Sequence, residues 1–364
     1  MPKIIDPRKW HNVSGNRWIR SNFMKTLEFR HPDWIPCSMS MYQAVWGKYR
    51  EKLKEITVRH PFVFGTAARF RPRKSFGKPA WEQESHTEYV DNWGEVWHTA
   101  KAGYAGQVVK HPLADWNALA TYQFPDPAKL MEGRKRDWRK EAVLLGLGRR
   151  LKVYTAGSGE RLFDRLYFLR GFNNLMRDFA TNNPNLPVLV QRLTEHELFI
   201  VNKYLKIRPD IVNFHTDIGM QDRLMISPRQ FRQYIKPMYA ALFKPLREAG
   251  IHVYLSSDGH LLEIVDDLIE CGVSVHDPQL RANTLEGIKK HYKGKLCIDL
   301  DLDRQSFPFY TPEQLKKQVK DAIDALSMSE GGLMMKAEIS DPNTPLENIE
   351  AICEAFEEYC VPSN

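Results

Sequence analysis

From about residue 150 onward, short apolar runs typical of strands alternate with longer amphipathic runs typical of helices. This alternation predicts repeated βα units around a parallel sheet. The six predicted strands are LKVYTAG (151–157), DIVNFHTD (210–217), IHVYLSSD (251–258), VSVHD (273–277), LCIDLDLD (296–303) and GLMMKAEIS (332–340). The helices that follow them are predicted near 161–180, 228–249, 261–271, 284–293, 312–327 and 345–359.

Three of these helices carry a start signal, a hydroxyl N-cap followed by proline at the first helical position. The pairs are Ser227-Pro228, Thr311-Pro312 and Thr344-Pro345. A seventh strand is predicted at IPCSMSM (35–41), and an eighth is expected within 60–155. The predicted fold class is therefore α/β, a (β/α)₈ TIM barrel forming one domain over 1–364, with an extended aromatic-rich N-terminal region. Long loop excursions in about 60–150 are expected to cover one barrel mouth.

Composition narrows the function classes. The chain is 43% hydrophobic and 27% charged, which is typical of a globular protein. It has no apolar stretch of roughly 18 residues and no signal-peptide core at its start, so we expect a cytoplasmic protein without membrane contact. The five cysteines lack metal-site spacing, and we expect them to be reduced thiols. The net charge of +7 is spread along the chain, which favours an acidic protein partner or a carboxylate substrate over nucleic acid. Homodimer formation is left open.

Polar residues follow the predicted strands. In a parallel barrel the strand C-termini open on one face, so these side chains are expected to converge on one pocket. They are His215, Asp217, Ser256, Asp258, His260, His276, Asp277, Asp299, Asp301, Asp303, Lys336 and Glu338. Acids and histidines in such a pocket indicate a divalent metal site or general acid/base chemistry. The alternative is that single acids, such as Asp258 and Asp277, only cap the following helix.

The first half of the chain is rich in aromatic side chains. They are Trp34, Tyr42, Trp46, Trp81, Trp93, Trp97, Tyr104 and Trp116. Such residues line slots for planar ligands, contact protein partners, or pack long loops onto a barrel. The segment GSGER (157–161) lacks a Walker lysine, so we predict a tight turn into the next helix that leaves Glu160 or Arg161 at the pocket edge.

Several motifs resemble the uroporphyrinogen decarboxylase-like superfamily, over roughly residues 90–360. DNWGEVW (91–97) and HPLADWNALATYQFPDP (111–127) are similar to its early Asp-x-Trp-Gly and later Pro-Asp-Pro, and ERLFDRLYFLRGFNNLMRD (160–178) to its Arg-Gly-Phe helix. HTDIGMQDRLMISPRQFRQYIKPMY (215–239), SSDGHLLEIVDDLIECGV (256–273) and GGLMMKAEISDPNTPLENIEAI (331–352) resemble its closing units. The resemblance implies the barrel, and an enzyme.

Two departures from the family patterns narrow the activity. The arginine-rich N-terminal motif of the true decarboxylases is absent before residue 60, which disfavours porphyrinogen decarboxylation. The zinc-dependent methyltransferases carry His-x-Cys-Gly where this chain has Ser256, Ser257, Asp258 and Gly259, and a late Cys where it has Glu338. The Ser-Asp-Gly pattern resembles the corrinoid-dependent O-demethylase branch. Oxygen ligands at these positions favour an oxygen-rich site over a thiolate zinc site.

The resemblance implies a methyltransferase that moves a methyl group from a small methylated substrate, such as a methoxyaromatic compound, to the cobalamin of a partner corrinoid protein. The chain has no cobalamin motif of its own, so the cofactor is expected on the partner. Asp258 and Glu338, with His260 or His276, are expected to hold zinc, another divalent metal or a proton against the leaving oxygen. His215 and Asp217 are expected to orient the substrate, and Asp217 also belongs to the expected catalytic set. Trp93, Trp97, Tyr104 and Arg161 are expected to line the substrate slot.

Two other functions remain open. One is a decarboxylase for a small carboxylated substrate, with Arg161 or Arg281 binding the carboxylate. The other is a non-catalytic ligand-binding barrel, which the acids and histidines at the strand ends disfavour because buried charge without a use is costly.

Overall fold

The computed structural model describes residues 7–9, 17–65, 68, 87–99, 106–129, 137–148, 153 and 155–362. Its contacts divide the chain into two compact units, and both are built from separate stretches of sequence. Unit 1 consists of Met1–Ala80, Arg150–Val153 and Asp277–Asn364, and unit 2 consists of Trp81–Arg149 and Tyr154–His276. One domain over 1–364 stays a prediction.

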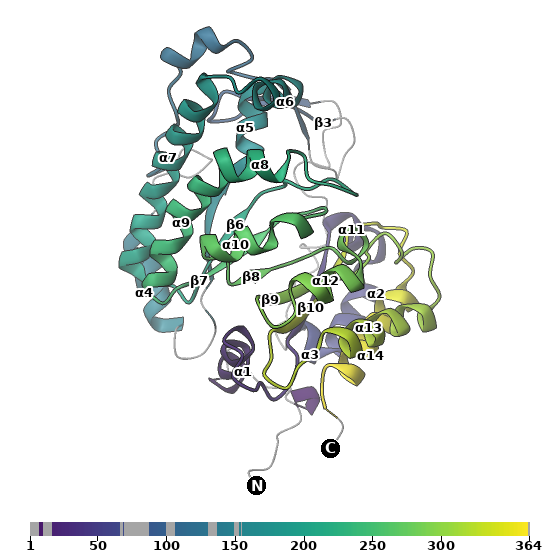
Figure 1. The fold of residues 1–364 in the computed structure, drawn as a ribbon. Helices are drawn as coiled ribbons and strands as arrows, with labels where there is room; N and C mark the ends of the chain where they lie inside the picture. The colour runs from purple at the N-terminus through teal and green to yellow at the C-terminus, as the bar shows by residue number, and fades with distance from the viewer. Residues whose placement is uncertain are drawn as a thin grey trace. The chain divides into compact units, whose positions relative to one another are not determined.

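Unit 1 is built on three parallel strands in the order β1-β10-β9, with bounds Cys37–Met41, Leu333–Ile339 and Cys297–Asp301. Helices α13 and α14 run side by side in this unit (Figure 1). The helices of unit 1 are η1 Pro7–Lys9, α1 Arg17–Leu27, α2 Gln43–Arg59, α3 Pro61–Phe64, α11 Leu280–Asn283, α12 Leu285–His291, α13 Pro312–Leu326 and α14 Leu346–Tyr359.

Unit 2 is built on four parallel strands in the order β5-β6-β7-β8, with bounds Thr155–Arg161, Ile211–His215, His252–Ser256 and Val275–His276. A separate antiparallel sheet has the order β2-β3-β4, with bounds Thr87–Val90, Val96–Thr99 and Gln107–Lys110. The helices of unit 2 are η5 Trp116–Ala120, α4 Trp138–Gly148, α5 Leu162–Arg170, α6 Phe172–Thr181, α7 Asn185–Ile207, α8 Pro228–Gln230, π-helix η6 Phe231–Ile235, α9 Lys236–Glu248, η7 Leu262–Ile264 and α10 Val265–Cys271.

The parallel strands separate apolar from polar side chains by alternation. On β6, Val212 and Phe214 are fully buried, whereas His215 at the strand end is exposed. On β10, Ala337 is buried between Lys336 and Glu338, which are partly exposed. Because successive side chains of a strand point to opposite faces, one face of each sheet packs in the core and the other carries polar groups. The fold is therefore α/β with parallel strands followed by helices, as predicted. The closed eight-stranded barrel stays a prediction.

Several predicted boundaries need correction. The helix predicted over 161–180 is two helices, because Gly171 between α5 and α6 has φ +83° and lies against the His111 ring, where a Cβ would come within 3.1 Å. The turn predicted at 157–161 is wrong, because β5 continues to Arg161 with a break in its pairing with β6. The hydroxyl N-caps predicted at Ser227 and Thr311 are confirmed, and each forms a capping box with a glutamine. The N-cap predicted at Thr344 is wrong, because the last helix begins at Leu346 with Pro345 as its N-cap.

Several elements were not predicted, among them helices α1, α2 and α4. The 23-residue helix α7, Asn185–Ile207, lies in a stretch for which no helix or strand was predicted. The β2-β3-β4 sheet lies in the region predicted to be loop excursions. Over the part of the chain that the structure describes, no helix is long and apolar enough to cross a membrane.

Candidate functional site

The loops that follow β6 and β7 are joined backbone to backbone in unit 2. Gly259 has φ +90°, and a Cβ on it would lie 2.4 Å from the carbonyl carbon of Gly219. The amide of His260 donates to the carbonyl of Met220 over 2.7 Å. Only glycines permit this approach, because a side chain on either residue would meet the backbone of the other loop. The two predicted strand-end segments therefore hold each other in one arrangement.

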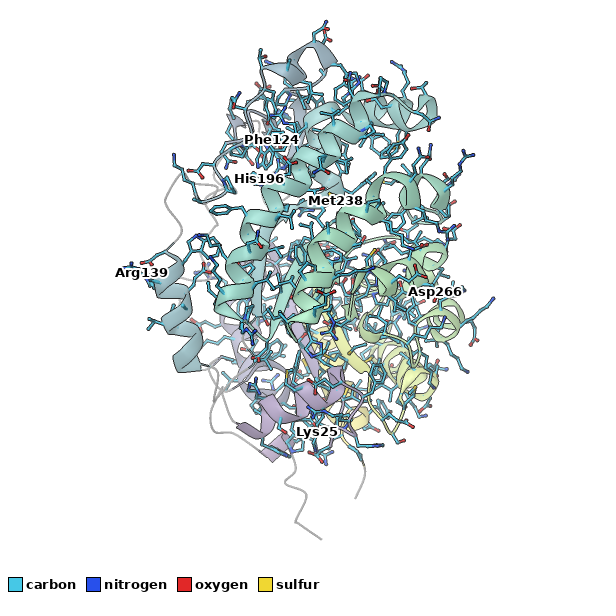
Figure 2. The ribbon with its side chains drawn as sticks, turned by 60° about the vertical axis from the view of Figure 1, so that its left-hand side comes forward. Lys25, Phe124, Arg139, His196, Met238 and Asp266 are labelled. Atoms are coloured by element: carbon cyan, nitrogen blue, oxygen red, sulfur yellow. The ribbon has the colours of Figure 1, made fainter. Side chains whose placement is uncertain are left out.

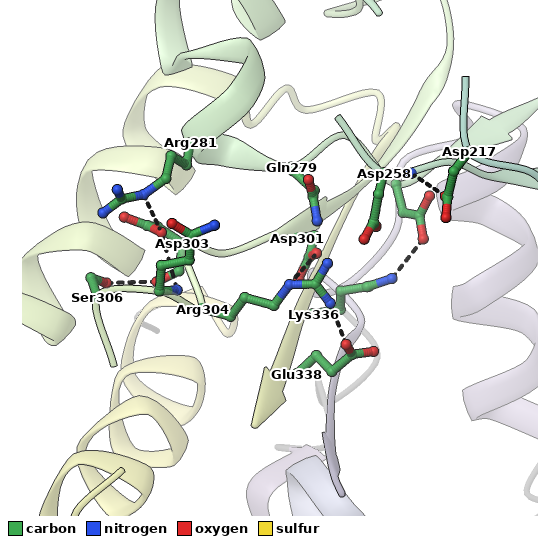
Figure 3. A network of polar contacts seen from close by, with 12 residues as sticks. Asp217, Asp258, Gln279, Arg281, Asp301, Asp303, Arg304, Ser306, Lys336 and Glu338 are labelled. Atoms are coloured by element: carbon green, nitrogen blue, oxygen red, sulfur yellow. Dashed lines mark hydrogen bonds and ion pairs between the residues drawn. The ribbon is translucent and has the colours of Figure 1, made fainter. Parts of the chain in front are cut away.

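Asp217 and Asp258 are neighbours in this arrangement. The amide of Asp258 donates to Oδ1 of Asp217 over 3.0 Å (Figure 3). The Asp217 side chain is 37% exposed, and a guanidinium nitrogen of Arg161 lies 3.6 Å from its Oδ2. The structure thus brings Arg161, Asp217 and Asp258 together.

Asp164, which the sequence did not predict as a site residue, bonds to both Asp217 and Arg161. Asp164, in the first turn of α5, is fully buried and accepts a hydrogen bond from the Asp217 amide at 2.8 Å. Its carboxylate also accepts from the Tyr167 hydroxyl at 2.9 Å and from Arg161 at 3.0 Å. A buried carboxylate is stable only when its oxygens are paired in this way. The signal in the sequence was an acid at the start of an apolar helix, which is also typical of an ordinary first-turn aspartate.

The surroundings of Asp217 favour a bound proton. Burial raises the pKa of Asp217 to about 6, and the nearby carboxylates of Asp164 and Asp258 add to this effect. The Asp258 amide and the Arg161 guanidinium act in the opposite direction without cancelling it. A carboxyl group with a pKa near 6 can both donate and accept a proton close to neutral pH.

Unit 1 carries its own polar set at the ends of β9 and β10. The Lys336 ammonium donates to Asp277 over 2.6 Å, and Lys336 is paired in register with Asp301. Figure 3 shows Lys336 with Asp301 and Glu338. Asp301 is 2% exposed, and burial raises its pKa to about 7 although Lys336 and Arg304 counteract this. Its Oδ1 atom is buried and accepts no hydrogen bond from the described residues. Asp301 is thus a second carboxyl group that holds a proton near neutral pH.

Glu338 is engaged within unit 1. The guanidinium of Arg304 forms an ion pair with Glu338, and the Tyr42 hydroxyl donates to Glu338 Oε1 over 3.0 Å. Arg281, a predicted carboxylate binder, is itself paired with Asp303 at 2.9 Å. The positive charge around Glu338 comes from a protein side chain, so this carboxylate is poorly suited to bind a second cation.

The remaining predicted residues lie in several environments of unit 2. His276 is fully buried on β8, and His260 is mostly buried with Nε2 3.9 Å from Glu263. Trp93 is 1% exposed and packs against His196 and Phe124, which lie side by side (Figure 2). Trp97 stacks on Tyr89 and donates its indole N–H to Asp91. Tyr104 lies outside the described residues.

In the described ranges, no three His, Cys, Asp or Glu side chains are arranged to hold a metal ion. The set Asp258, Glu338, His260 and His276 draws on both units and stays a prediction. The chemistry that the described residues support is proton transfer by carboxyl groups, with arginine and lysine beside them.

Comparison with known proteins agrees with the α/β architecture. The structure is similar to a methyltransferase from Methanosarcina mazei, with a TM-score of 0.62 and 15% identity over 94% of this chain and 98% of that one. At this identity the likeness concerns the fold. A dihydropteroate synthase from Yersinia pestis matches with a TM-score of 0.26 and 13% identity over 39% of this chain and 53% of that one, too weakly to bear on the argument. A search of curated proteins finds no match.

The sequence itself matches a protein family over more than half of its length. The model for uroporphyrinogen decarboxylase (URO-D) matches residues 163–359, which include Asp164, Asp217, Asp258, Asp301 and Glu338. This agrees with the resemblance carried by the motifs of the second half. The chain belongs to the uroporphyrinogen decarboxylase (URO-D) family.

Proposed function

We propose that this protein is a methyltransferase that takes a methyl group from a small methylated substrate, such as a methoxyaromatic compound, and passes it to the corrinoid of a partner protein. Family membership and the fold shared with a methyltransferase support an enzyme of this kind. The observation that carries the proposal is the carboxyl group of Asp217, which has a pKa of about 6 and lies beside Arg161 and Asp258.

The chemistry of a methyl ether explains why such a group is needed. When the carbon–oxygen bond breaks, the methyl group leaves the oxygen and the oxygen keeps the electron pair of that bond. Without a proton the product would be a poorly stable oxyanion, so general acid catalysis contributes typically 10²–10⁴-fold to such steps. The reduced cobalt of the partner's corrinoid supplies the nucleophile that receives the methyl group. Asp217 supplies the proton to the departing oxygen and is reprotonated from solvent.

The other residues have roles that follow from their contacts. Asp164 fixes the Asp217 backbone, and the Asp258 amide holds one Asp217 oxygen, so that the second oxygen is directed by Arg161. His215 ends β6 with an exposed side chain, and we propose that it contacts the substrate. For Asp258, Glu338, His260 and His276 we retain the predicted role near the leaving oxygen, and for Trp93, Trp97 and Tyr104 the predicted contact with the substrate. No step through a metal is derived.

The test is a reconstituted reaction. Purified protein, a reduced corrinoid protein and a panel of methoxyaromatic donors are mixed, and methylation of the corrinoid is followed by its absorption spectrum while the demethylated phenol is measured by mass spectrometry. We expect both signals with at least one donor, and a loss of about 10²-fold or more in rate for Asp217→Asn. The matched control is Asp222→Asn in the same loop, whose side chain is 67% exposed. No methylation with any donor would overturn the proposal.

A decarboxylase is the second candidate, and one observation favours it. The Arg161 side chain is 52% exposed although it is paired with Asp164, so its guanidinium can still reach a carboxylate on a substrate. Release of carbon dioxide from a small carboxylated substrate in the absence of any corrinoid, lost in Arg161→Gln, would replace the methyltransferase proposal with this one.

A further inference from the structure

Unit 1 contains a pocket of about 200 Å³ at the N-terminal ends of its strands. Cys37 and Ser38, the first residues of β1, line it together with Met334 and Met335 near the start of β10. Ligand sites of parallel barrels lie at the C-terminal ends of the strands, where Glu338 is found. The pocket is therefore separate from the strand ends to which the proposed reaction is assigned.

Four aromatic side chains form part of its wall. Trp18 and Phe23 come from α1, Phe62 comes from α3, and Trp34 lies between α1 and β1. The Trp18 and Trp34 ring centroids are 4.3 Å apart and their planes are inclined by 58°. Trp34 is only 6% exposed, so its ring is held in place by packing. Rings inclined to one another present more than one π face to the same small volume.

The charge in and behind the pocket is negative. Among the described residues that line it, Asp299 is the one charged side chain. Behind it, Lys336 interacts electrostatically with Asp277, Asp301 and Asp299, and its ammonium is bonded to Asp277. Arg304 also lies beside Asp301 and is paired with Glu338. Two cations thus face four carboxylates, and three even when Asp301 holds a proton. The excess of negative charge favours a cationic ligand.

The lining also selects the kind of cation. The faces of Trp and Phe attract a cation within about 6 Å of the ring centroid, and methionine side chains add polarizable apolar surface. A primary ammonium would lose hydrogen bonds to water here, because indole, phenyl and thioether groups accept them poorly. An ammonium whose hydrogens are replaced by alkyl groups loses none. We propose that this pocket is a binding site for a small alkylated ammonium cation, distinct from the site of the proposed methyl transfer.

Choline and 3,3-dimethyl-1-butanol test the proposal, because the second compound has the same shape with carbon in place of the charged nitrogen. Binding of each to the full-length wild-type protein is measured by isothermal titration calorimetry, since nine tryptophans would dilute a fluorescence signal from two. We expect saturable binding of choline and at least tenfold weaker binding of the neutral compound. In Asp299→Asn choline binding should weaken about tenfold, whereas it should not change in Asp324→Asn, whose carboxylate lies on the exposed side of α13.

Two results would overturn the proposal. If the two compounds bind equally well, charge plays no part and the pocket is only an apolar cavity. If choline shows no saturable binding, the pocket does not recognise alkylated ammonium. The comparison of the two compounds needs only the wild-type protein, so it decides the question even if Asp299→Asn fails to fold. Trp18→Leu should reduce choline binding and provides a second, uncharged change in the same wall.

Discussion

Gly219 and Gly259 touch through their backbones, so that a Cβ on Gly259 would lie 2.4 Å from the carbonyl carbon of Gly219 and 2.6 Å from its oxygen. We predict that Gly259→Ala separates the two loops and destabilises the protein by more than about 1 kcal/mol, because the change adds both a collision and strain at positive φ. The measurement is the free energy of unfolding in urea. Gly146→Ala in α4 is the control, since no atom lies within 4 Å of its Cβ, and it should stabilise slightly. Equal stability of the two variants would contradict the close contact.

The pH dependence of methyl transfer should report Asp217. Its pKa is raised to about 6, so it carries the proton below this pH and loses it above. We predict that the rate of methyl transfer falls as pH rises through about 6, and that Asp217→Asn abolishes this pH dependence along with most of the activity.

The raised pKa of Asp217 also has a consequence for the stability of the protein. The folded state binds this proton more tightly than the unfolded state. The free energy of unfolding of the wild type should therefore fall, relative to that of Asp217→Asn, as pH rises from about 4 to about 6. Urea titrations across that range measure it, and parallel curves would exclude the raised pKa.

The carboxylate of Asp258 can be removed without removing the hydrogen bond that its amide donates to Asp217. Since the Asp258 side chain is exposed, we predict that Asp258→Ala changes the unfolding free energy by less than about 0.5 kcal/mol. If the carboxylate acts on the leaving oxygen, the rate should nevertheless fall by about 10²-fold. Steady-state kinetics and urea unfolding on the same preparation separate the two effects. A more stable variant that binds ligand as well as the wild type would support a non-catalytic binding barrel.

Arg170 and Asp178 form a buried ion pair at 2.7 Å, with exposures of 8% and 3%. Arg170 also donates to the carbonyl of Leu113 and stacks on Trp116. We predict that Arg170→Met costs about 3–5 kcal/mol, because the buried Asp178 would lose its cationic partner and keep only the hydrogen bond from the Trp116 indole. Chemical denaturation measures the loss. Arg223→Met, which removes an exposed pair with Asp222, should cost far less than Arg170→Met, and a similar cost for both would refute the role of burial.

His60 lies 3.1 Å from Glu357 and 3.6 Å from Glu350 in unit 1. Burial lowers the pKa of His60, but these two carboxylates outweigh it, so the net pKa is raised above 6.5. The charged imidazole therefore stabilises the fold fully below pH 6.5, and this contribution is lost as pH rises through the higher folded pKa. We predict that wild type and His60→Gln differ more in unfolding free energy at pH 5.5 than at pH 8.5. A difference that is constant with pH would contradict the raised pKa.

The strands could be predicted because each is a short apolar run bounded by polar residues, as in the segments that contain Phe214, Leu255 and Ala337. Helix α7 escaped prediction because Pro184 and Pro187 stand at its start and resemble a loop signal, although proline is tolerated in a first helical turn. The β2-β3-β4 sheet escaped because strands of four residues show too little alternation.

Only those site residues that lie at the ends of strands could be predicted from the sequence. Asp217 and Asp258 follow their strands directly, so the topology of parallel strands brings them together. Asp164 could not be identified, because an acid in the first turn of a helix is ordinarily solvated and only the folded backbone places it under Asp217. The hydrogen bond from Tyr42 to Glu338 could not be predicted either, since the two residues are 296 positions apart in the sequence.

The pairing of β1 with β10 has a consequence for the biosynthesis of the protein. Cys37 is paired with Met335, so after its synthesis β1 must wait for the translation of almost 300 further residues before its partner exists. An unpaired strand edge can join other chains during that time. Pairing over such a separation is also slow, because the loop must close before the contacts form. Among the strands that the structure describes, the order of synthesis exposes β1 longest, and assistance by chaperones should matter most for it.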